Sequence, residues 1–151
     1  MMSPASWHHG VMASRVGAHL REFVHRQSLG EVAAAETGFL IERNPDTVRA
    51  PDVAFVRRER LKNAPARGFF PGAPDLAVEV LSPDDSAADV LAKVEDWLNA
   101  GSDQVWVIDP KHQSVSVYDR NRKHQSLRGE QELTGGDLLP GFHIKISELF
   151  A

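Results

Sequence analysis

Two features are missing from the sequence: it contains no cysteine, and it contains no long hydrophobic segment. Without cysteine the chain forms no disulfide, no thiolate zinc site and no cysteine nucleophile, and we expect a reducing, cytoplasmic location. No window approaches about eighteen consecutive apolar residues, the length that a membrane-spanning helix needs, so we expect no membrane partner. The N-terminus also lacks the charged and apolar stretches of a signal peptide.

Several catalytic motifs are missing as well. There is no glycine-rich phosphate loop and no nucleophile elbow, and the seven histidines show no metal-binding spacing. The remaining composition is that of an ordinary globular protein, with 42% apolar and 25% charged residues. A chain of 151 residues can bury a substantial core, so the sequence predicts a single domain over residues 1–151.

The charge is unevenly distributed along the chain. The net charge of -4 at first argues against a nucleic-acid partner. However, residues 71–109 contain nine acidic residues and a single basic one, Lys93, whereas residues 1–70 and 110–151 each carry a small positive net charge. The sequence therefore predicts an acidic central block between two mildly basic segments.

The N-terminal half begins with an amphipathic helix. Residues 8–27 have apolar side chains at helical spacing, and Ser6 can cap the start of the helix. The apolar positions are Met12, Val16, Leu20, Phe23 and Val24. Extended segments at 32–41 and 48–57 predict a hairpin or meander, and a loop rich in proline and glycine follows at 58–73.

The second half contains a strand–helix–strand unit. Residues 76–81 are a nearly continuous apolar run that suits a strand buried on both faces, and 104–108 is a second such strand, which should be parallel to the first. The apolar stripe of the helix between them is Val90, Leu91, Val94, Trp97 and Leu98. Segments 114–118 and 125–133 predict another hairpin, and 144–150 a closing element. The predicted fold class is therefore α/β, with a mixed sheet and a C-terminal β extension.

The buried strand at 76–81 contains one carboxylate, Glu79. An unpaired charge is costly to bury, so Glu79 needs a cation, a hydrogen-bond network or a raised pKa. The alternative is an edge position where Glu79 faces solvent or an arginine.

Asp52 and Asp75 each follow a proline at the start of a predicted strand, where either could simply cap a turn. Asp75 and Glu79 share a strand face but lie about 13 Å apart, too far to bind one ion. Two carboxylate ligands of one ion must come from neighbouring strands. We therefore expect Asp52 and Glu79 to be the two carboxylates that bind one ion. Asp75 would support these ligands without binding the ion, or would belong to a second site.

Lys93 is the only cation of the acidic block. It borders the apolar stripe of its predicted helix, so its stem can lie on the sheet while its amine reaches inward. Beside a metal site such an amine can position or activate a water, or stabilise the charge of a transition state. The alternative is a surface lysine with no specific role.

These residues belong to a longer pattern. It comprises residues 51–56 (PDVAFV), 74–83 (PDLAVEVLSP), Lys93, Trp97, 100–101, 105–110 (VWVIDP) and 138–142 (LLPGF). The pattern resembles the Uma-type family of putative restriction endonucleases over about residues 9–150, and the order of elements resembles the core of PD-(D/E)XK nucleases. The resemblance implies a restriction-endonuclease-like core of helix, β-hairpin, strand, helix and strand.

The resemblance also implies a metal-dependent DNA endonuclease. Asp52, Glu79 and the backbone carbonyl of Val80 would bind the metal. The family pattern expects a lysine two residues after Glu79, where this chain has Leu81, and Lys93 would replace it from the following helix. Oxygen ligands without cysteine favour Mg²⁺ or Mn²⁺.

Two more residues are candidates, and one segment departs from the family. Glu36 could add a carboxylate to the site or simply occupy a solvated turn. His9 matches a histidine of the family, and its role could be structural or a phosphate contact. Family members usually begin with an N-terminal segment that this sequence is expected to lack.

Two basic runs could contact the DNA backbone, although solvated loops are an equal alternative. The first is Arg57, Arg58, Arg60, Lys62 and Arg67, and the second is Arg120, Arg122, Lys123 and Arg128. Cleavage of both DNA strands would favour a homodimer.

Two other hypotheses stay open: a degenerate nuclease fold that binds nucleic acid or protein without cutting it, and a structural domain whose carboxylates pair with arginines. Convergence of Asp52, Glu79 and Lys93 in one cleft is required by the nuclease hypothesis, allowed by the degenerate fold and unexpected for the structural domain.

Overall fold

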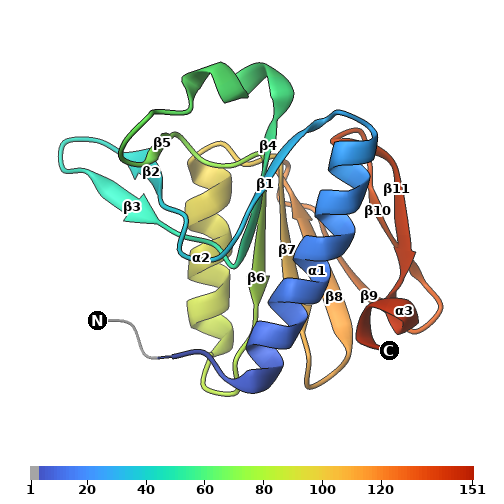
Figure 1. The fold of residues 1–151 in the computed structure, drawn as a ribbon. Helices are drawn as coiled ribbons and strands as arrows, with labels where there is room; N and C mark the ends of the chain where they lie inside the picture. Colours follow the sequence, from blue (N-terminus) through green and yellow to red (C-terminus); the bar gives the residue numbers. More distant parts are fainter. Residues whose placement is uncertain (1–3) are drawn as a thin grey trace.

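The computed structural model describes residues 4–151, which fold around a six-stranded sheet with a long helix on each face (Figure 1). In sheet order the strands are Gly30–Ala33 (β1), Val53–Arg57 (β4), Leu76–Val80 (β6), Gln104–Asp109 (β7), Ser114–Asp119 (β8) and His124–Arg128 (β9). β6 and β7 are parallel, and the other neighbouring pairs are antiparallel. The predicted α/β fold with a mixed sheet is confirmed.

The first helix, α1 (Trp7–Arg26), packs on one face of this sheet. Its N-cap is Ser6, whose side chain accepts a hydrogen bond from the backbone N–H of His9. All five apolar residues of the predicted stripe are buried. The predicted amphipathic helix at 8–27 is thus confirmed to within a residue at each end.

The second helix, α2 (Ala87–Asn99), packs on the opposite face. Ser86 caps its start, and Gly101 follows its end with a φ of +112°, a conformation that favours glycine. Val94 and Trp97 of the predicted stripe are buried, but Leu91 is 51% exposed, so its inclusion was wrong.

A small second sheet lies over the α2 side of the molecule. It consists of Phe39–Glu42 (β2), Thr47–Arg49 (β3) and Phe70–Pro71 (β5). The prediction of a hairpin or meander over 32–41 and 48–57 was therefore incomplete, because β1 pairs with β4 while β2 and β3 form a separate hairpin between them. Phe39 explains the insertion, since its ring packs on Phe70 and Trp97 and so covers α2.

Two other predicted segments are more structured or more divided than expected. The loop at 58–73 contains the short 3-10 helix η1 (Arg58–Asn63) in addition to β5. The predicted strand 125–133 splits at Gly129 into β9 and β10 (Glu132–Gly135), and β10 pairs with β11 (Leu139–Lys145). The helix α3 (Ile146–Phe150) closes the chain.

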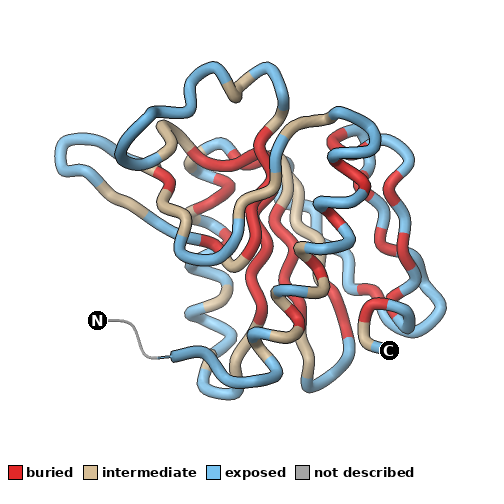
Figure 2. Tube along the Cα trace, in the orientation of Figure 1, coloured by how far each residue is buried: buried red, intermediate tan, exposed pale blue. Residues whose placement is uncertain are grey.

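The central strands are buried along most of their length (Figure 2). Side chains of β6 alternate between the two faces: Val78 and Val80 pack in the core that includes α1, and Ala77 packs in the core that includes α2. Glu79 therefore faces α2. In the part of the chain that the structure describes, no helix is long and apolar enough to cross a membrane.

Candidate active site

Asp52 lies immediately before β4, beside the carboxyl end of β6. Its backbone N–H donates a 3.0 Å hydrogen bond to the carbonyl of Val78, and its Oδ2 accepts a 2.7 Å hydrogen bond from the backbone N–H of Val80. Because β4 and β6 are antiparallel, the start of one meets the end of the other. Asp52 and Glu79 therefore come from neighbouring strands at the same end of the sheet.

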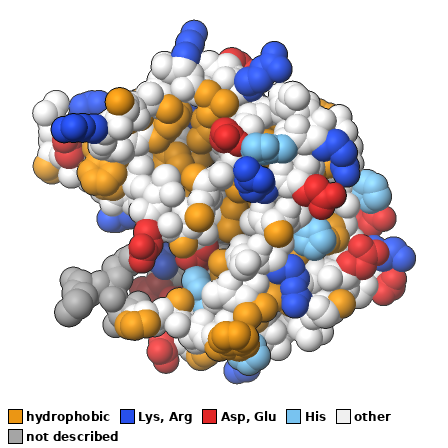
Figure 3. Space-filling view, viewed as in Figure 1, with side chains coloured by type: hydrophobic (Ala, Val, Ile, Leu, Met, Phe, Trp, Pro, Cys, Tyr) orange, Lys and Arg blue, Asp and Glu red, His pale blue; other side chains and the backbone are white. Residues whose placement is uncertain are grey.

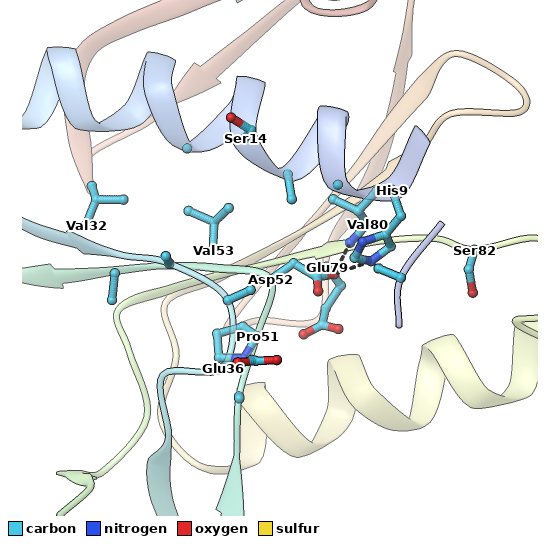
Figure 4. Close-up of a pocket in the computed structure, with 18 of the residues that line it drawn as sticks. His9, Ser14, Val32, Glu36, Pro51, Asp52, Val53, Glu79, Val80 and Ser82 are labelled. Atoms are coloured by element: carbon cyan, nitrogen blue, oxygen red, sulfur yellow. Dashed lines mark hydrogen bonds and ion pairs between the residues drawn. The ribbon is translucent and has the colours of Figure 1, made fainter. Parts of the chain in front are cut away.

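His9, in the first turn of α1, also contacts Asp52. Its Nε2 lies 3.2 Å from Asp52 Oδ2, and both side chains are largely buried. Figure 4 shows His9 above Asp52, with dashed lines from the imidazole and from the backbone of Val80 that meet at the Asp52 carboxylate. One oxygen of Asp52 thus has two fixed partners, while Oδ1 has none in residues 4–151.

Glu79 is buried, and two side chains of α2 contact it. The indole N–H of Trp97 donates a 3.4 Å hydrogen bond to Oε1, and Lys93 Nζ lies 3.9 Å from Oε2. Lys93 and Trp97 are four residues apart, so they lie on the same face of α2. Lys93 itself is half-exposed, which leaves its amine free to move between Glu79 and the solvent.

The electrostatics of this pair are unusual. Burial and, second, the nearby charge of Asp52 raise the pKa of Glu79 from its ordinary value of 4.5 to about 8. Lys93 and the hydrogen bond from Trp97 act in the opposite direction but do not compensate. Two crowded carboxylates of this kind are stabilised by a cation between them, and pKa values perturbed in this way are concentrated at functional sites.

The two carboxylates lie in a cleft of about 960 Å³ at one end of the sheet, where it is lined by α1, by the turn after β1 and, through Lys93, by α2. Lys93 and Ser82 line the same cleft, together with Glu36, which has a φ of +69° in the turn after β1. Figure 3 shows acidic side chains recessed at one end of a hollow whose walls carry hydrophobic side chains. The structure therefore brings Asp52, Glu79, Lys93, His9 and Glu36 together.

The donor set fits a cation that does not need a complete protein cage. Among residues 4–151 there is no group of three or more His, Asp or Glu side chains that could hold a metal ion. Mg²⁺ is commonly bound through one or two carboxylates and keeps several waters and substrate phosphates as its other ligands. Asp52 and Glu79 offer such a pair, and their mutual repulsion is what a divalent cation would relieve.

Asp75 lies at the other end of β6, outside the cleft. Its carboxylate accepts a 2.8 Å hydrogen bond from the backbone N–H of Arg57 and lies 3.1 Å from Arg60 Nη1. The sequence left open that Glu79 pairs with an arginine instead of a metal. In the structure it is Asp75, and not Glu79, that pairs with arginines. The structure does not bring Asp75 to the candidate metal ligands.

Most residues of the two basic runs also lie at that far end, but Arg128, which pairs with Ser114 of β8, lies at the same end of the sheet as Val80. Arg57 and Arg120 both form ion pairs with Asp103, and Arg122 contacts Glu95. The exposed Arg58, Lys62 and Lys123 lie in the same region, and they form no ion pair within residues 4–151. In Figure 1 the segment after β4 lies at the top of the molecule, and α1, whose first turn contains His9, the partner of Asp52, begins at the bottom. None of these cations lines the cleft.

Sequence reasoning missed the contact between Trp97 and Glu79. Trp97 was expected only as part of the apolar stripe of α2, and it is indeed buried. A buried indole N–H usually needs an acceptor, and Glu79 is the only carboxylate in the strand that the helix covers. The need of this indole for an acceptor, together with the four-residue spacing of Lys93 and Trp97, could have predicted the contact from the sequence.

Comparisons with known proteins agree with this fold. A family model described as "Uma2: Putative restriction endonuclease" matches residues 1–147. The crystal structure of a putative nuclease belonging to DUF820 from Anabaena variabilis ATCC 29413 is similar, with a TM-score of 0.84 and 24% identity over 99% of this chain and 84% of that chain. No curated protein matches the sequence. The chain therefore belongs to the Uma2 family of putative restriction endonucleases.

Proposed function

We propose that the protein is a metal-dependent nuclease that hydrolyses phosphodiester bonds in DNA. Membership of a restriction-endonuclease family supports nuclease chemistry in general. The observation that carries the proposal for this chain is the convergence of Asp52 and Glu79 in one cleft, with the amine of Lys93 beside them.

Asp52, Glu79 and the backbone carbonyl of Val80 would hold Mg²⁺ or Mn²⁺. When bound, the ion would polarise the scissile phosphate and lower the pKa of a bound water. The protein contributes the fixed positions of its ligands. His9 and the N–H of Val80 orient the Asp52 carboxylate, and Trp97 orients that of Glu79.

Lys93 would act on the water or on the phosphate. Its Nζ lies at the outer side of Glu79, at 3.9 Å, on a half-exposed side chain that can reach a group entering the cleft. An ammonium in that position can orient the attacking water by donating a hydrogen bond to its oxygen, and it stabilises negative charge as it develops on the phosphate. This role does not require Lys93 to bind the metal.

The basic residues at the end of the sheet opposite the cleft do not act on the scissile phosphate in this proposal. Its cations do not line the cleft, so any contact that they make with DNA is remote from the scissile phosphate. A homodimer follows only if both strands of a duplex are cut, since each chain has one such cleft containing Asp52 and Glu79.

A plasmid-nicking assay with Mg²⁺ or Mn²⁺ tests the proposal. We expect the wild type to nick DNA, and Asp52→Asn and Glu79→Gln each to lose at least about a hundredfold in rate, as expected when a metal ligand is removed. Glu42→Gln, at the exposed end of β2, is a matched control and should keep full activity. Wild-type protein that cleaves no DNA with either metal, yet retains DNA in a salt-sensitive manner, would support the non-cutting alternative and contradict the proposal.

A further inference from the structure

We infer that the cleft receives an unpaired nucleotide strand, so that the substrate is single-stranded DNA or an unpaired region of a duplex. This inference rests on the proposed nuclease function, because it concerns what reaches Asp52 and Glu79. Three properties of the cleft carry it: its depth, its lining and the position of its cations.

The first property is depth. The side chain of Asp52 is only 20% exposed and that of Glu79 only 11%, so both carboxylates lie below the surface. The N-terminal half of α1 forms one wall, and the turn after β1 forms the other (Figure 4). In a regular duplex each phosphate is held beside stacked base pairs on a stiff rod, whereas an unpaired strand can bend to bring a phosphate into a recess.

The second property is the lining. Beyond the carboxylates the cleft continues over small apolar residues of α1, β1 and the segment before β4. They include Ala13, Gly17, Val32, Ala33, Ala34 and Ala50. Such a surface accommodates the flat face of a base released from stacking, and the volume of about 960 Å³ lies at the upper end of the range for small-ligand pockets.

The lining also bears on sequence preference. The residues that line the cleft, within the part of the chain that the structure describes, include no Asn, Gln, Phe, Tyr or Trp. Asn and Gln are the residues that commonly read adenine, and aromatic rings are the usual stacking platforms. Contact with bases would therefore depend on shape, and we expect little discrimination among sequences.

The third property is the spacing of positive charge. Arg21 lines the cleft on α1, twelve residues after His9, which corresponds to about 18 Å along the helix axis. Arg21 is exposed and forms no ion pair within residues 4–151. Lys93 lies at the other end, beside Glu79. The two cations therefore bracket the apolar lining, at a separation that suits phosphates several nucleotides apart on one strand.

Binding can be measured separately from cleavage. We would compare the fluorescence anisotropy of a labelled mixed-sequence single strand with that of the same sequence as a blunt duplex, in EDTA and at one salt concentration. We expect the single strand to bind about tenfold more tightly, a difference of about 1.4 kcal/mol, since only it enters the cleft. Equal or tighter binding of the duplex would overturn the inference.

Matched variants locate the strand. Ala34→Trp fills the cleft and Arg21→Ala removes its distal cation, so each should weaken single-strand binding by about tenfold. Ala66→Trp and Arg43→Ala are exposed controls outside the cleft and should have no effect. If Arg58→Ala and Lys62→Ala abolish binding while Arg21→Ala does not, the strand binds at the far end of the sheet and the inference is wrong.

The two proposals fail in different ways. Preferential single-strand binding that depends on Arg21, without metal-dependent cleavage, contradicts the nuclease function and leaves the binding inference in place. Metal-dependent nicking that requires Glu79 but acts equally on duplex and single strands, and that tolerates Ala34→Trp, contradicts only the inference about the substrate.

Discussion

The backbone N–H of Val80, at the end of β6, donates a 2.7 Å hydrogen bond to the carboxylate of Asp52, at the start of β4. This bond joins two strands that are antiparallel neighbours and directs Asp52 toward Glu79, the residue before Val80. The position of the candidate site thus depends on the pairing of the central sheet rather than on a flexible loop. Sites held in this way are better organised for binding an ion than sites on loops.

Replacing Asp52 by Asn removes one negative charge but keeps an oxygen that can accept the hydrogen bond from Val80. Since the charge of Asp52 raises the pKa of Glu79, we expect the Glu79 pKa to fall below about 8 in this variant. An NMR titration of the Glu79 side-chain carboxyl in metal-free protein measures this. An unchanged pKa would mean that the two carboxylates do not interact.

The stability of the metal-free protein should fall as the pH rises. The pKa of Glu79 is raised from 4.5 to about 8 in the folded state, so between these values the folded state binds more protons than the unfolded state. The contribution of Glu79 to the free energy of unfolding is therefore fully present below about pH 4.5 and is lost as the pH rises to about 8, at up to about 1.4 kcal/mol per unit.

Urea unfolding at pH 5, 7 and 9 in EDTA measures this effect, with Glu79→Gln as the control because it cannot titrate. We expect the wild type to lose stability relative to Glu79→Gln as the pH rises, and Mg²⁺ to restore part of the loss at high pH. Parallel curves for the two proteins would contradict the raised pKa.

Trp97 is a positioning residue for Glu79 in this account. Trp97→Phe keeps an aromatic ring against Phe39 but loses the indole donor, so the pKa of Glu79 should rise further and metal affinity at pH 7 should fall several-fold. The loss should diminish at pH 9, where Glu79 ionises. Calorimetric metal titrations at both pH values provide the measurement.

Trp106→Phe is the matched control for that experiment. Trp106 is fully buried in the other core and donates its indole N–H to Gln104, so the same substitution removes similar volume without a contact to Glu79. Both variants should be destabilised by a few kcal/mol, roughly as for other truncations of large core residues. If both variants lose metal affinity equally, the loss in Trp97→Phe results from reduced stability and not from the missing hydrogen bond to Glu79.

Asp75 should matter for stability and not for metal binding. Asp75→Ala leaves the N–H of Arg57 and the part-exposed guanidinium of Arg60 without their carboxylate partner, which should cost about 1–3 kcal/mol, the range for leaving a buried donor unsatisfied. Urea denaturation measures the loss, and a metal titration of the folded variant should match the wild type. Reduced metal affinity in folded Asp75→Ala would instead place Asp75 at a second metal site.

Local sequence patterns predicted the central elements well, because each has a clear physical signature. The continuous apolar run at β6 and the helical spacing in α1 both specify burial without information from elsewhere in the chain. The insertion of β2 and β3 between β1 and β4 could not be predicted in this way, because strand pairing over that distance leaves no local pattern.

The contrast between Asp52 and Asp75 is the clearest case for the site. Both follow a proline at the start of a strand, and the local patterns do not distinguish them. Because β4 and β6 are antiparallel, the starts of these strands lie at opposite ends of the sheet, which separates a cleft carboxylate from one paired with arginines. The first basic run, which begins at the end of β4, is separated from the cleft for the same reason. That Asp52 and Glu79 bind metal stays a prediction.

The account depends most on Asp52 and Glu79 acting as one cation site. A calorimetric titration with Mn²⁺ at pH 8, on the wild type, Asp52→Asn and Glu79→Gln, tests this directly. The account predicts one ion per wild-type chain and at least about a tenfold loss of affinity in each variant, as for removal of a ligand or its support. No binding to the folded wild type, or equal binding by all three proteins, would contradict it.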